Sequence, residues 1–281
     1  MSITSEPSRF AWRKLSAAKW EDVWPERLSE FADRLAITAL RGAKTIRLEV
    51  FALSKADAER LHAAFGGSIV PHRQDWIATQ RAPRPPIRVR GKLLVVSARA
   101  DLPRPPSKCA TLVIPAGMAF GTGEHATTVT CLRLLADVAA ELGGEPWEML
   151  DLGCGSGILA LAARRLGAGK VDARDFDPAC VRIAKENAAI NAIRGVRVKR
   201  LDVLRWTPKG NWRVIAANLF SSLLVAIAPQ LASALAPGGR LIFSGILREQ
   251  EAEVVAAFRA AGLRVLKRAP KGKWVSGLAS R

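Results

Sequence analysis

The fold of this 281-residue chain is decided by the stretch Met149-Leu150-Asp151-Leu152-Gly153-Cys154-Gly155-Ser156-Gly157-Ile158-Leu159-Ala160. The stretch passes from an apolar run to a glycine-rich loop and then to a second apolar run, which is typical of a strand, a turn and a helix. A loop that brings the backbone against a ligand needs glycine, because a Cβ atom would clash and some positions need positive φ. The stretch therefore predicts a ligand-binding turn at the end of a buried strand.

The spacing of the glycines distinguishes two classes of cofactor. Dinucleotide-binding loops have the pattern G-x-G-x-x-G and place a pyrophosphate at the helix N-terminus. Here Gly153, Gly155 and Gly157 form G-x-G-x-G shortly after Asp151. A carboxylate suits a cofactor that carries a positively charged amine and sulfonium better than it suits a pyrophosphate. The loop therefore favours S-adenosylmethionine as the cofactor.

Strands and helices alternate from about residue 111 onward, which predicts a parallel sheet covered by helices. The expected strands are 148–152, 170–176, 196–201, 214–218, 240–244, 263–268 and 274–277. The expected helices are 158–166, 178–192, 222–234 and 249–260, and a sharp turn is expected at Pro237-Gly238-Gly239. With the cofactor above, this order predicts a Rossmann-like, seven-stranded class I methyltransferase domain of the α/β class.

Acidic side chains follow the second and third of these strands, at the edge where ligands bind in such sheets. Asp175 ends the second strand, and its carboxylate is expected to accept hydrogen bonds from both ribose hydroxyls. Asp177, just before Pro178, is expected to cap the next helix. Asp202 follows the third strand, where a contact with the adenine amino group and a plain surface turn are equal alternatives.

The fourth strand ends at Asn218, where the transferred methyl group is expected to emerge. The Asn218 amide offers an acceptor and a donor that can orient an amine, so this residue is the catalytic candidate. Methyltransferases that act on amino groups of flat bases have Asn/Asp-Pro-Pro-aromatic here, whereas this chain has Asn218-Leu219-Phe220 and no tyrosine. The difference favours an aliphatic amine as substrate, and stacking of Phe220 on a base stays open.

The first 110 residues differ in character. Residues 1–75 have the strand–helix–strand–strand–helix–strand order of a ferredoxin-like α+β unit. The expected elements there are 10–16, 19–31, 34–40, 45–53, 55–65 and 68–72, with a hairpin turn at 41–44. Pro25 predicts a kink or a helix start within 19–31. Residues 76–110 are rich in proline and arginine and contain one expected strand at 92–97. They are expected to form a linker that packs against a neighbour rather than a domain of its own. The expected methyltransferase domain then spans residues 111–281.

Bulk composition narrows the class of protein further. The four cysteines are Cys109, Cys131, Cys154 and Cys180. They form no C-x-x-C pair, which argues against a zinc site or a disulfide framework. No metal is therefore expected. Neither a membrane-length apolar run nor a secretory signal is recognisable, so a cytoplasmic location is expected. The net charge of +18 fits two interpretations, attraction to RNA or the ribosome and simple solubility. We found no basic stretch interleaved with aromatic residues, and both interpretations stay open.

A second motif lies upstream of the glycine loop and reads Met118-Ala119-Phe120-Gly121-Thr122-Gly123-Glu124-His125-Ala126-Thr127-Thr128. It resembles the Phe-Gly-Thr-Gly-x-His-x-Thr-Thr segment of the bacterial ribosomal protein L11 methyltransferase (PrmA) family. Residues 151–160, 218–219 and 244–247 also resemble segments of that family, in the same order. The resemblance covers roughly residues 115–281, and residues 1–75 match in the order of their elements.

The resemblance implies that the N-terminal domain recognises a protein substrate and that the linker lets the catalytic domain reach several amino groups. The implied substrate is ribosomal protein L11, methylated on lysine ε-amines and on its N-terminal α-amine. Departures from the family pattern at Ala116, Glu124 and Ala126 leave another protein, or rRNA, as the alternative substrate. A monomer is the default expectation. The expected cofactor contacts are Thr128, Asp151, Gly153, Gly155, Gly157, Asp175, Asp202 and Asn218.

Two features of the second motif also have plainer interpretations. Thr127-Thr128 would form the N-cap of a helix over 129–140. His125 is expected to orient its loop rather than to act as a base. We therefore expect no dedicated general base, with Asn218 and nearby carbonyl groups orienting the amine and water taking its proton.

Overall fold

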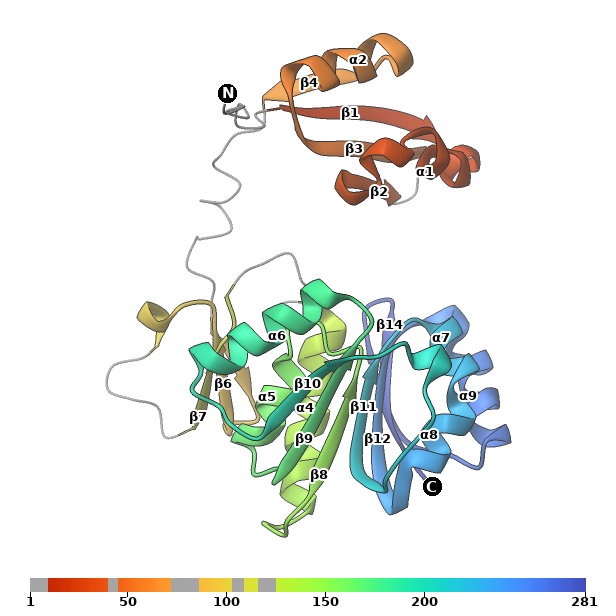
Figure 1. Cartoon of the computed structure of the whole chain (residues 1–281). Helices are drawn as coiled ribbons and strands as arrows, with labels where there is room; N and C mark the ends of the chain where they lie inside the picture. Colours follow the sequence, from red (N-terminus) through yellow and green to blue (C-terminus); the bar gives the residue numbers. More distant parts are fainter. Residues whose placement is uncertain (1–9, 40–44, 72–85, 103–108, 116–124) are drawn as a thin grey trace. The chain divides into compact units, whose positions relative to one another are not determined.

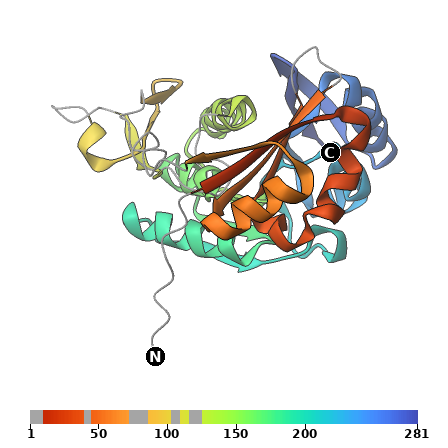
Figure 2. The same ribbon diagram turned by 90° about the horizontal axis from the view of Figure 1, so that it is seen from above.

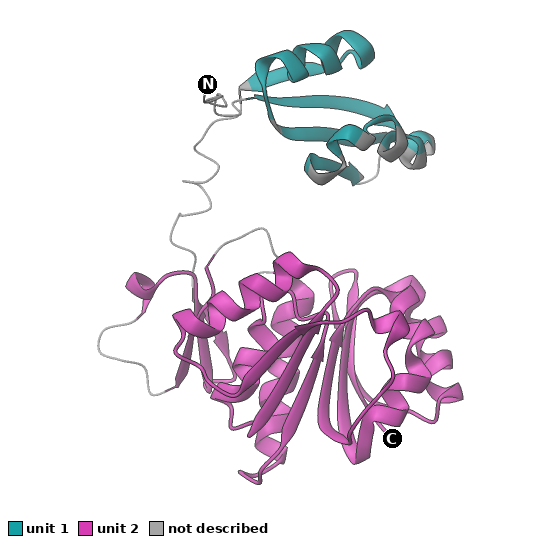
Figure 3. Ribbon diagram, viewed as in Figure 1, with its two compact units in different colours: residues 1–82 teal, residues 83–281 magenta. Residues whose placement is uncertain are grey.

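The structure is a computed structural model that describes residues 10–39, 45–71, 86–102, 109–115 and 125–281 (Figure 1). The chain divides into two compact units, Met1–Ala82 and Pro83–Arg281 (Figure 3). No helix among the described residues is long and apolar enough to cross a membrane. The turn expected at 41–44 and the residues Met118–Glu124 of the second motif lie outside the described residues.

The first unit contains an antiparallel sheet in the order β2-β3-β1-β4, which is the ferredoxin-like order predicted from the sequence. The strands are β1 Phe10–Ala17, β2 Leu35–Ala39, β3 Thr45–Leu53 and β4 Ser68–Pro71. Helix α2, Lys55–Phe65, begins where predicted, because the Ser54 side chain accepts a hydrogen bond from the Asp57 N–H at 3.0 Å. It ends at Gly66, whose φ is +67°.

The helical stretch expected over 19–31 is divided, with a helix start next to Pro25 as the sequence predicted. The structure has three short pieces there, η1 Ala18–Val23, α1 Trp24–Arg27 and η2 Ser29–Arg34. Pro25 lacks an N–H and favours a helix start, which accounts for the break at Trp24. The pieces still bury Trp24, Leu28 and Phe31 in the core of this unit, against Trp12 of β1.

The second unit begins with a small sheet in the segment that the sequence analysis assigned to a linker. Its strands are β5 Ile87–Val89, β6 Leu93–Val96 and β7 Ala110–Val113. Apolar side chains of this sheet, among them Val89, Leu93 and Leu112, belong to the same buried cluster as the helices that follow. The described part of 86–110 is therefore built into the second unit, because the apolar residues of its strands are buried there.

A seven-stranded sheet in the order β10-β9-β8-β11-β12-β14-β13 forms the centre of the second unit, as the sequence predicted. The strands from β10 to β12 in this order are parallel, and β14 is antiparallel to both of its neighbours. The strands are β8 Glu148–Leu152, β9 Lys170–Asp175, β10 Val196–Arg200, β11 Trp212–Asn218, β12 Leu235–Leu247, β13 Arg264–Lys271 and β14 Trp274–Ser280. The turn expected at Pro237-Gly238-Gly239 lies within β12, at an irregularity where the register against β11 shifts and Gly238 has φ +67°.

Helices cover this sheet from both sides (Figure 1 and Figure 2). One buried cluster joins it to α4 Ala126–Glu141, α5 Ile158–Arg165 and α6 Pro178–Ile190. A second cluster joins the opposite face to α7 Ser221–Ala226, α8 Ala228–Ala234 and α9 Glu251–Ala260. The helix expected over 222–234 is divided at Ile227, because Pro229 favours a new helix start.

Candidate active site

The glycine loop lies at the carboxyl edge of the sheet, between β8 and α5. The N–H groups of Gly153 and Cys154 both donate to the carbonyl oxygen of Arg174, at 2.8 and 3.0 Å, which holds the loop against the end of β9. Gly153 has φ +69°, and a Cβ there would lie 2.4 Å from Leu219 Cδ2. Gly157 has φ +78° and is the N-cap residue of α5. A Cβ atom at this position would lie 3.0 Å from Ala184 Cβ. Both positions therefore require glycine.

Asp175 is joined directly to this loop. Its Oδ2 accepts a hydrogen bond from the Gly155 N–H at 2.8 Å, and its Oδ1 accepts one from the Asp177 N–H at 3.0 Å. Each bond uses one lone pair, so each oxygen keeps capacity for one further donor. The carboxylate is half-buried at the end of β9. The loop and the acid that the sequence proposed as two parts of one cofactor site thus lie at the same edge of the sheet.

Asp151 lies under the loop with only 1% of its surface exposed. Its Oδ2 accepts a hydrogen bond from the Ala160 N–H at 3.1 Å. Burial raises the pKa of this carboxyl to about 7; the bond from Ala160 opposes the shift and the charge of Asp175 adds to it. A nearby cation would favour the ionised form, whereas a phosphate would oppose it. The electrostatics therefore suit a cationic cofactor.

The end of β11 meets the start of α4 through a chain of hydrogen bonds. Asn218 Nδ2 donates to Thr127 Oγ1 at 3.4 Å, and that hydroxyl lies 2.7 Å from His125 Nδ1. His125 Nδ1 also accepts a hydrogen bond from the Thr127 N–H at 3.4 Å. The ring proton therefore belongs on Nε2, and the Thr127 hydroxyl donates to Nδ1. Burial, followed by the charge of Lys273, lowers the pKa of His125 and favours the neutral ring.

Two buried polar atoms at this edge have no hydrogen-bond partner among the described residues, Thr128 Oγ1 and Asn218 Oδ1. Leaving a buried polar group unsatisfied costs roughly 1–3 kcal/mol of stability. Such atoms are therefore candidates to form hydrogen bonds with a ligand. Together with Asp175, these two atoms place a hydroxyl, an amide oxygen and a carboxylate around the glycine loop. This set fits the amino and hydroxyl groups of S-adenosylmethionine.

Other expected site residues have structural roles in the fold. Asp177 caps α6 as predicted, with Oδ1 2.7 Å from the Ala179 N–H. Asp202 caps the one-turn helix η4, Val203–Arg205, through a bond from the Leu204 N–H to Oδ1 at 3.0 Å, which matches the plain surface-turn alternative. Its contact with adenine stays a prediction.

The helix cap expected at Thr127-Thr128 is wrong. Helix α4 begins one residue before them, at Ala126, and His125 is the capping residue. Both threonines are consequently buried in the first turn, 1% exposed each. Gly245 lies in the segment 244–247 that resembles the family, but its close contact behind Asn218 was not predicted from the sequence. Gly245 has φ +87°, and a Cβ there would lie 2.3 Å from the Leu219 carbonyl oxygen.

These features define a class I, S-adenosylmethionine-dependent methyltransferase: a glycine loop, an acid after the second strand and an asparagine after the fourth, on one edge of a seven-stranded sheet. The model of the family "Ribosomal protein L11 methyltransferase (PrmA)" matches residues 5–281. The chain belongs to that family.

Individual relatives agree with this family. The chain is 40% identical over 227 residues to a ribosomal protein L11 methyltransferase of Chloroflexus aurantiacus, covering 72% of this chain and 68% of that protein. It is 42% identical over 209 residues to one of Pelotomaculum thermopropionicum, covering 74% and 66%. These matches thus span about two thirds of the relatives' own length. The solved structure of a ribosomal protein L11 methylase from Lactobacillus delbrueckii subsp. bulgaricus is 31% identical, with a TM-score of 0.62, covering 70% of this chain and 99% of that one.

Proposed function

We propose that this chain transfers methyl groups from S-adenosylmethionine to lysine ε-amines and the N-terminal α-amine of ribosomal protein L11. The observation that carries the chemistry is the buried, unpartnered Oδ1 of Asn218 beside the glycine loop. The substrate is supported by family membership over residues 5–281 and by the names of the relatives. The absence of the Pro-Pro-aromatic element after Asn218 supports an amine over a nucleobase.

The residues of the chain hold the cofactor and orient the amine. The proposed cofactor contacts are Thr128, Asp151, Gly153, Gly155, Gly157, Asp175, Asp202 and Asn218. When bound, the cofactor supplies a methyl group already activated by a sulfonium, so alignment and exclusion of water are the main tasks of the protein. Asn218 Oδ1 accepts an N–H of the incoming amine and thereby directs the nitrogen lone pair.

The amine must be neutral to react. A lysine with a pKa near 10.4 needs about 4 kcal/mol to lose its proton near pH 7.5, whereas an α-amine needs well under about 1 kcal/mol. Burial beside a cation lowers the lysine pKa and offsets part of that cost. His125 Nδ1 is occupied by Thr127, which supports a reaction without a dedicated base, with water taking the proton.

The organisation of the protein completes the proposal. The ferredoxin-like unit recognises the substrate, and the catalytic unit acts on several of its amino groups. The protein acts in the cytoplasm as a monomer, and its basic surface contacts rRNA. Substrate recognition by the ferredoxin-like unit rests on the resemblance to the family. The rRNA contact rests on the net charge of +18.

Labelling tests the proposal. The full chain is incubated with methyl-labelled S-adenosylmethionine and either purified L11 or protein-free rRNA. Label is expected in L11, at lysine side chains and at the N-terminus, as located by mass spectrometry. Label in rRNA alone would establish the alternative, an rRNA methyltransferase, for which the exposed Phe220 is available to stack on a base. Calorimetric binding of the cofactor without label in either substrate would leave the fold assignment intact and refute the substrate.

A further inference from the structure

One face of the catalytic sheet lacks a helix beside its edge strands. The connection from β10 to β11, residues 201–211, is fully described and contains only η4, whereas the neighbouring connections carry α5, α6 or the α7–α8 pair. Parallel sheets are normally covered on both faces, and their strands are then apolar. The positions of β9 that face this side are Lys170, Asp172 and Arg174, which alternate along the strand. The sequence therefore places charges where a covered sheet would have apolar residues.

A hollow of about 470 Å³ lies over these strands. Five cationic side chains line it: Lys170, Arg174, Arg197, Arg200 and Lys209. Two carboxylates, those of Glu148 and Asp172, and two indole rings, those of Trp206 and Trp212, line it as well. The lining is net positive. None of the proposed cofactor contacts lines the hollow. The hollow adjoins the proposed methyl-transfer site through Arg174, whose backbone carbonyl holds the glycine loop, but the two share no lining residue.

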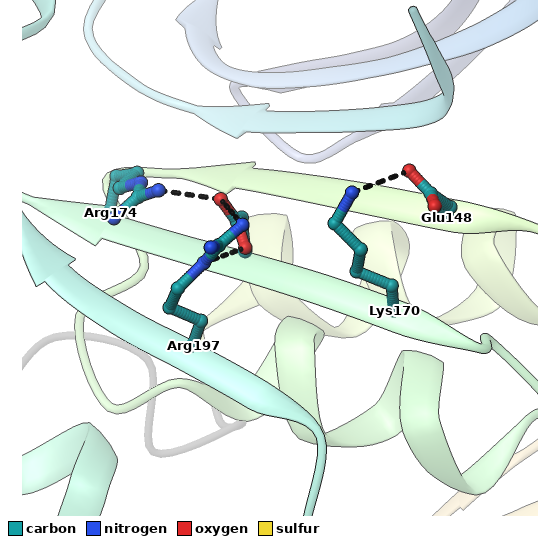
Figure 4. Close-up of polar contacts among 5 residues, drawn as sticks. Glu148, Lys170, Arg174 and Arg197 are labelled. Carbon is teal, nitrogen blue, oxygen red and sulfur yellow. Dashed lines mark hydrogen bonds and ion pairs between the residues drawn. The ribbon is translucent and has the colours of Figure 1, made fainter. Parts of the chain in front are cut away.

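Three of the cations, Lys170, Arg174 and Arg197, are held by ion pairs with carboxylates (Figure 4). Asp172, whose side chain is 4% exposed, accepts hydrogen bonds from Arg174 Nη2 at 2.5 Å and from Arg197 Nε at 2.8 Å. Lys170 Nζ lies 3.1 Å from a Glu148 oxygen and 5.1 Å from the centre of the Trp212 ring. One buried carboxylate thus positions two guanidinium groups, which lowers the conformational entropy lost when an anion binds.

We propose that this hollow is a docking site for the phosphate backbone of RNA. Guanidinium groups match phosphate in shape and charge, and half-buried Trp206 offers an indole ring on which a base can stack. The segment 200–213 places Trp206 and Trp212 among Arg200, Arg205 and Lys209, an aromatic interleaving that the sequence analysis overlooked. An acidic peptide would match the charge without using the indole. The proposal rests on the rRNA contact proposed above and gives it a location, and it does not depend on which amino group the enzyme methylates.

A binding experiment with the full chain tests the site. Fluorescence anisotropy measures the affinity for a labelled single-stranded RNA oligonucleotide over a series of NaCl concentrations. The double variant Arg197→Gln/Lys209→Gln is expected to bind about tenfold more weakly, and its slope of log K against log salt is expected to fall by about 1.4, near 0.7 per lost phosphate contact. The control Arg182→Gln/Lys185→Gln removes the same charge from exposed positions of α6 and is expected to bind like wild type.

Further arms separate the outcomes. Trp206→Ala is expected to weaken RNA binding and to leave any binding of poly-glutamate unchanged. All variants are expected to bind S-adenosylmethionine and to methylate free L11 at the wild-type rate, which also reports folding and keeps this test separate from that of the substrate. Lys209→Gln alone, in an exposed loop, serves if the double variant does not fold. Equal loss in both double variants, no RNA binding by wild type at physiological salt, or selective loss of poly-glutamate binding would each overturn the proposal.

Discussion

At the scale of single residues, the orientation of one amide decides what the site can do. Asn218 Nδ2 donates to Thr127 Oγ1, whose hydroxyl donates to His125 Nδ1. These two hydrogen bonds turn Asn218 Oδ1 away from Thr127. Asn218 Oδ1 is the atom without a partner among the described residues. A rotated amide would present a donor to an amine that itself needs an acceptor. Thr127 is thus a positioning residue that acts through Asn218.

Replacing Thr127 tests this positioning. Thr127→Val keeps the shape of the side chain and removes the hydroxyl, so kcat for L11 is expected to fall by about tenfold, the scale of one lost orienting bond of about 1.4 kcal/mol. The cofactor Kd from calorimetry is expected to rise by no more than a factor of about three, because Asn218 is one of eight proposed cofactor contacts and the others are untouched. Thr127→Ser is expected to restore most of kcat. A rise in Kd as large as the loss in kcat would contradict a role limited to orientation.

The buried carboxyl of Asp151 makes a second prediction, on pH. Because its pKa is raised to about 7, the free enzyme holds the proton below that pH. A cationic cofactor favours the ionised form, so the Kd for S-adenosylmethionine is expected to decrease as pH rises from 6 to 7.5 and then to level off. Asp151→Asn is expected to bind more weakly at pH 8 and to lose the dependence. Calorimetry in buffers of differing ionisation enthalpy would detect the released proton.

The same shift has a consequence for stability, with its sign set by linkage. The folded state holds the Asp151 proton more tightly than the unfolded chain, whose value is the ordinary 3.8. Stability from this group is therefore complete below about pH 4 and is lost as pH rises to about 7. The apo Asp151→Asn protein is expected to melt above wild type at pH 8, with the difference shrinking toward pH 5. Scanning calorimetry measures the Tm of both proteins across this pH range. An equal Tm for wild type and Asp151→Asn at pH 8 would rule out a buried charge at Asp151.

At the scale of elements, β12 braces the end of β11. A Cβ on Gly245 would lie 2.3 Å from the Leu219 carbonyl oxygen, and backbone cannot move aside as a side chain can. Gly245→Ala is expected to cost roughly 2–4 kcal/mol of unfolding free energy and to displace Asn218, lowering kcat as well. Gly262→Ala is the matched control, since Gly262 also has positive φ, +82°, with open space around it. It is expected to cost about 1–2 kcal/mol, from strain alone, with kcat unchanged. Equal urea-unfolding losses would contradict the brace.

At the scale of the whole molecule, each unit has a buried cluster made of its own residues. The fragment 83–281 is therefore expected to fold and to bind S-adenosylmethionine with a Kd within about threefold of the full chain. Methylation of L11 is expected to fall by about a hundredfold or more, because the recognition unit no longer raises the local substrate concentration. Circular dichroism, calorimetry and labelling measure the three properties. Full activity of the fragment on L11 would show that the first unit is not the recognition domain.

The sequence by itself determined the features that depend on neighbouring residues. Ser54, Asp177 and the glycines after Asp151 act on backbone groups a few positions away, so their patterns predict caps and turns directly. The alternation of strands and helices likewise predicted the seven-stranded sheet and the ferredoxin-like order. The break near Pro25 was likewise predicted from the proline, whereas the break near Pro229 was not, because the apolar spacing over 222–234 outweighed that proline in the prediction.

Only the tertiary structure decided the features that join distant parts of the chain. Thr127 and Asn218 are 91 residues apart, and they meet because β11 pairs with β8 and places its end beside the start of α4. Asp172 and Arg197, on adjacent strands, form a charged face because the next connection carries no long helix. Such contacts depend on which strands pair and which face each helix covers. That is a collective outcome of burying apolar surface, and no short stretch of sequence encodes it.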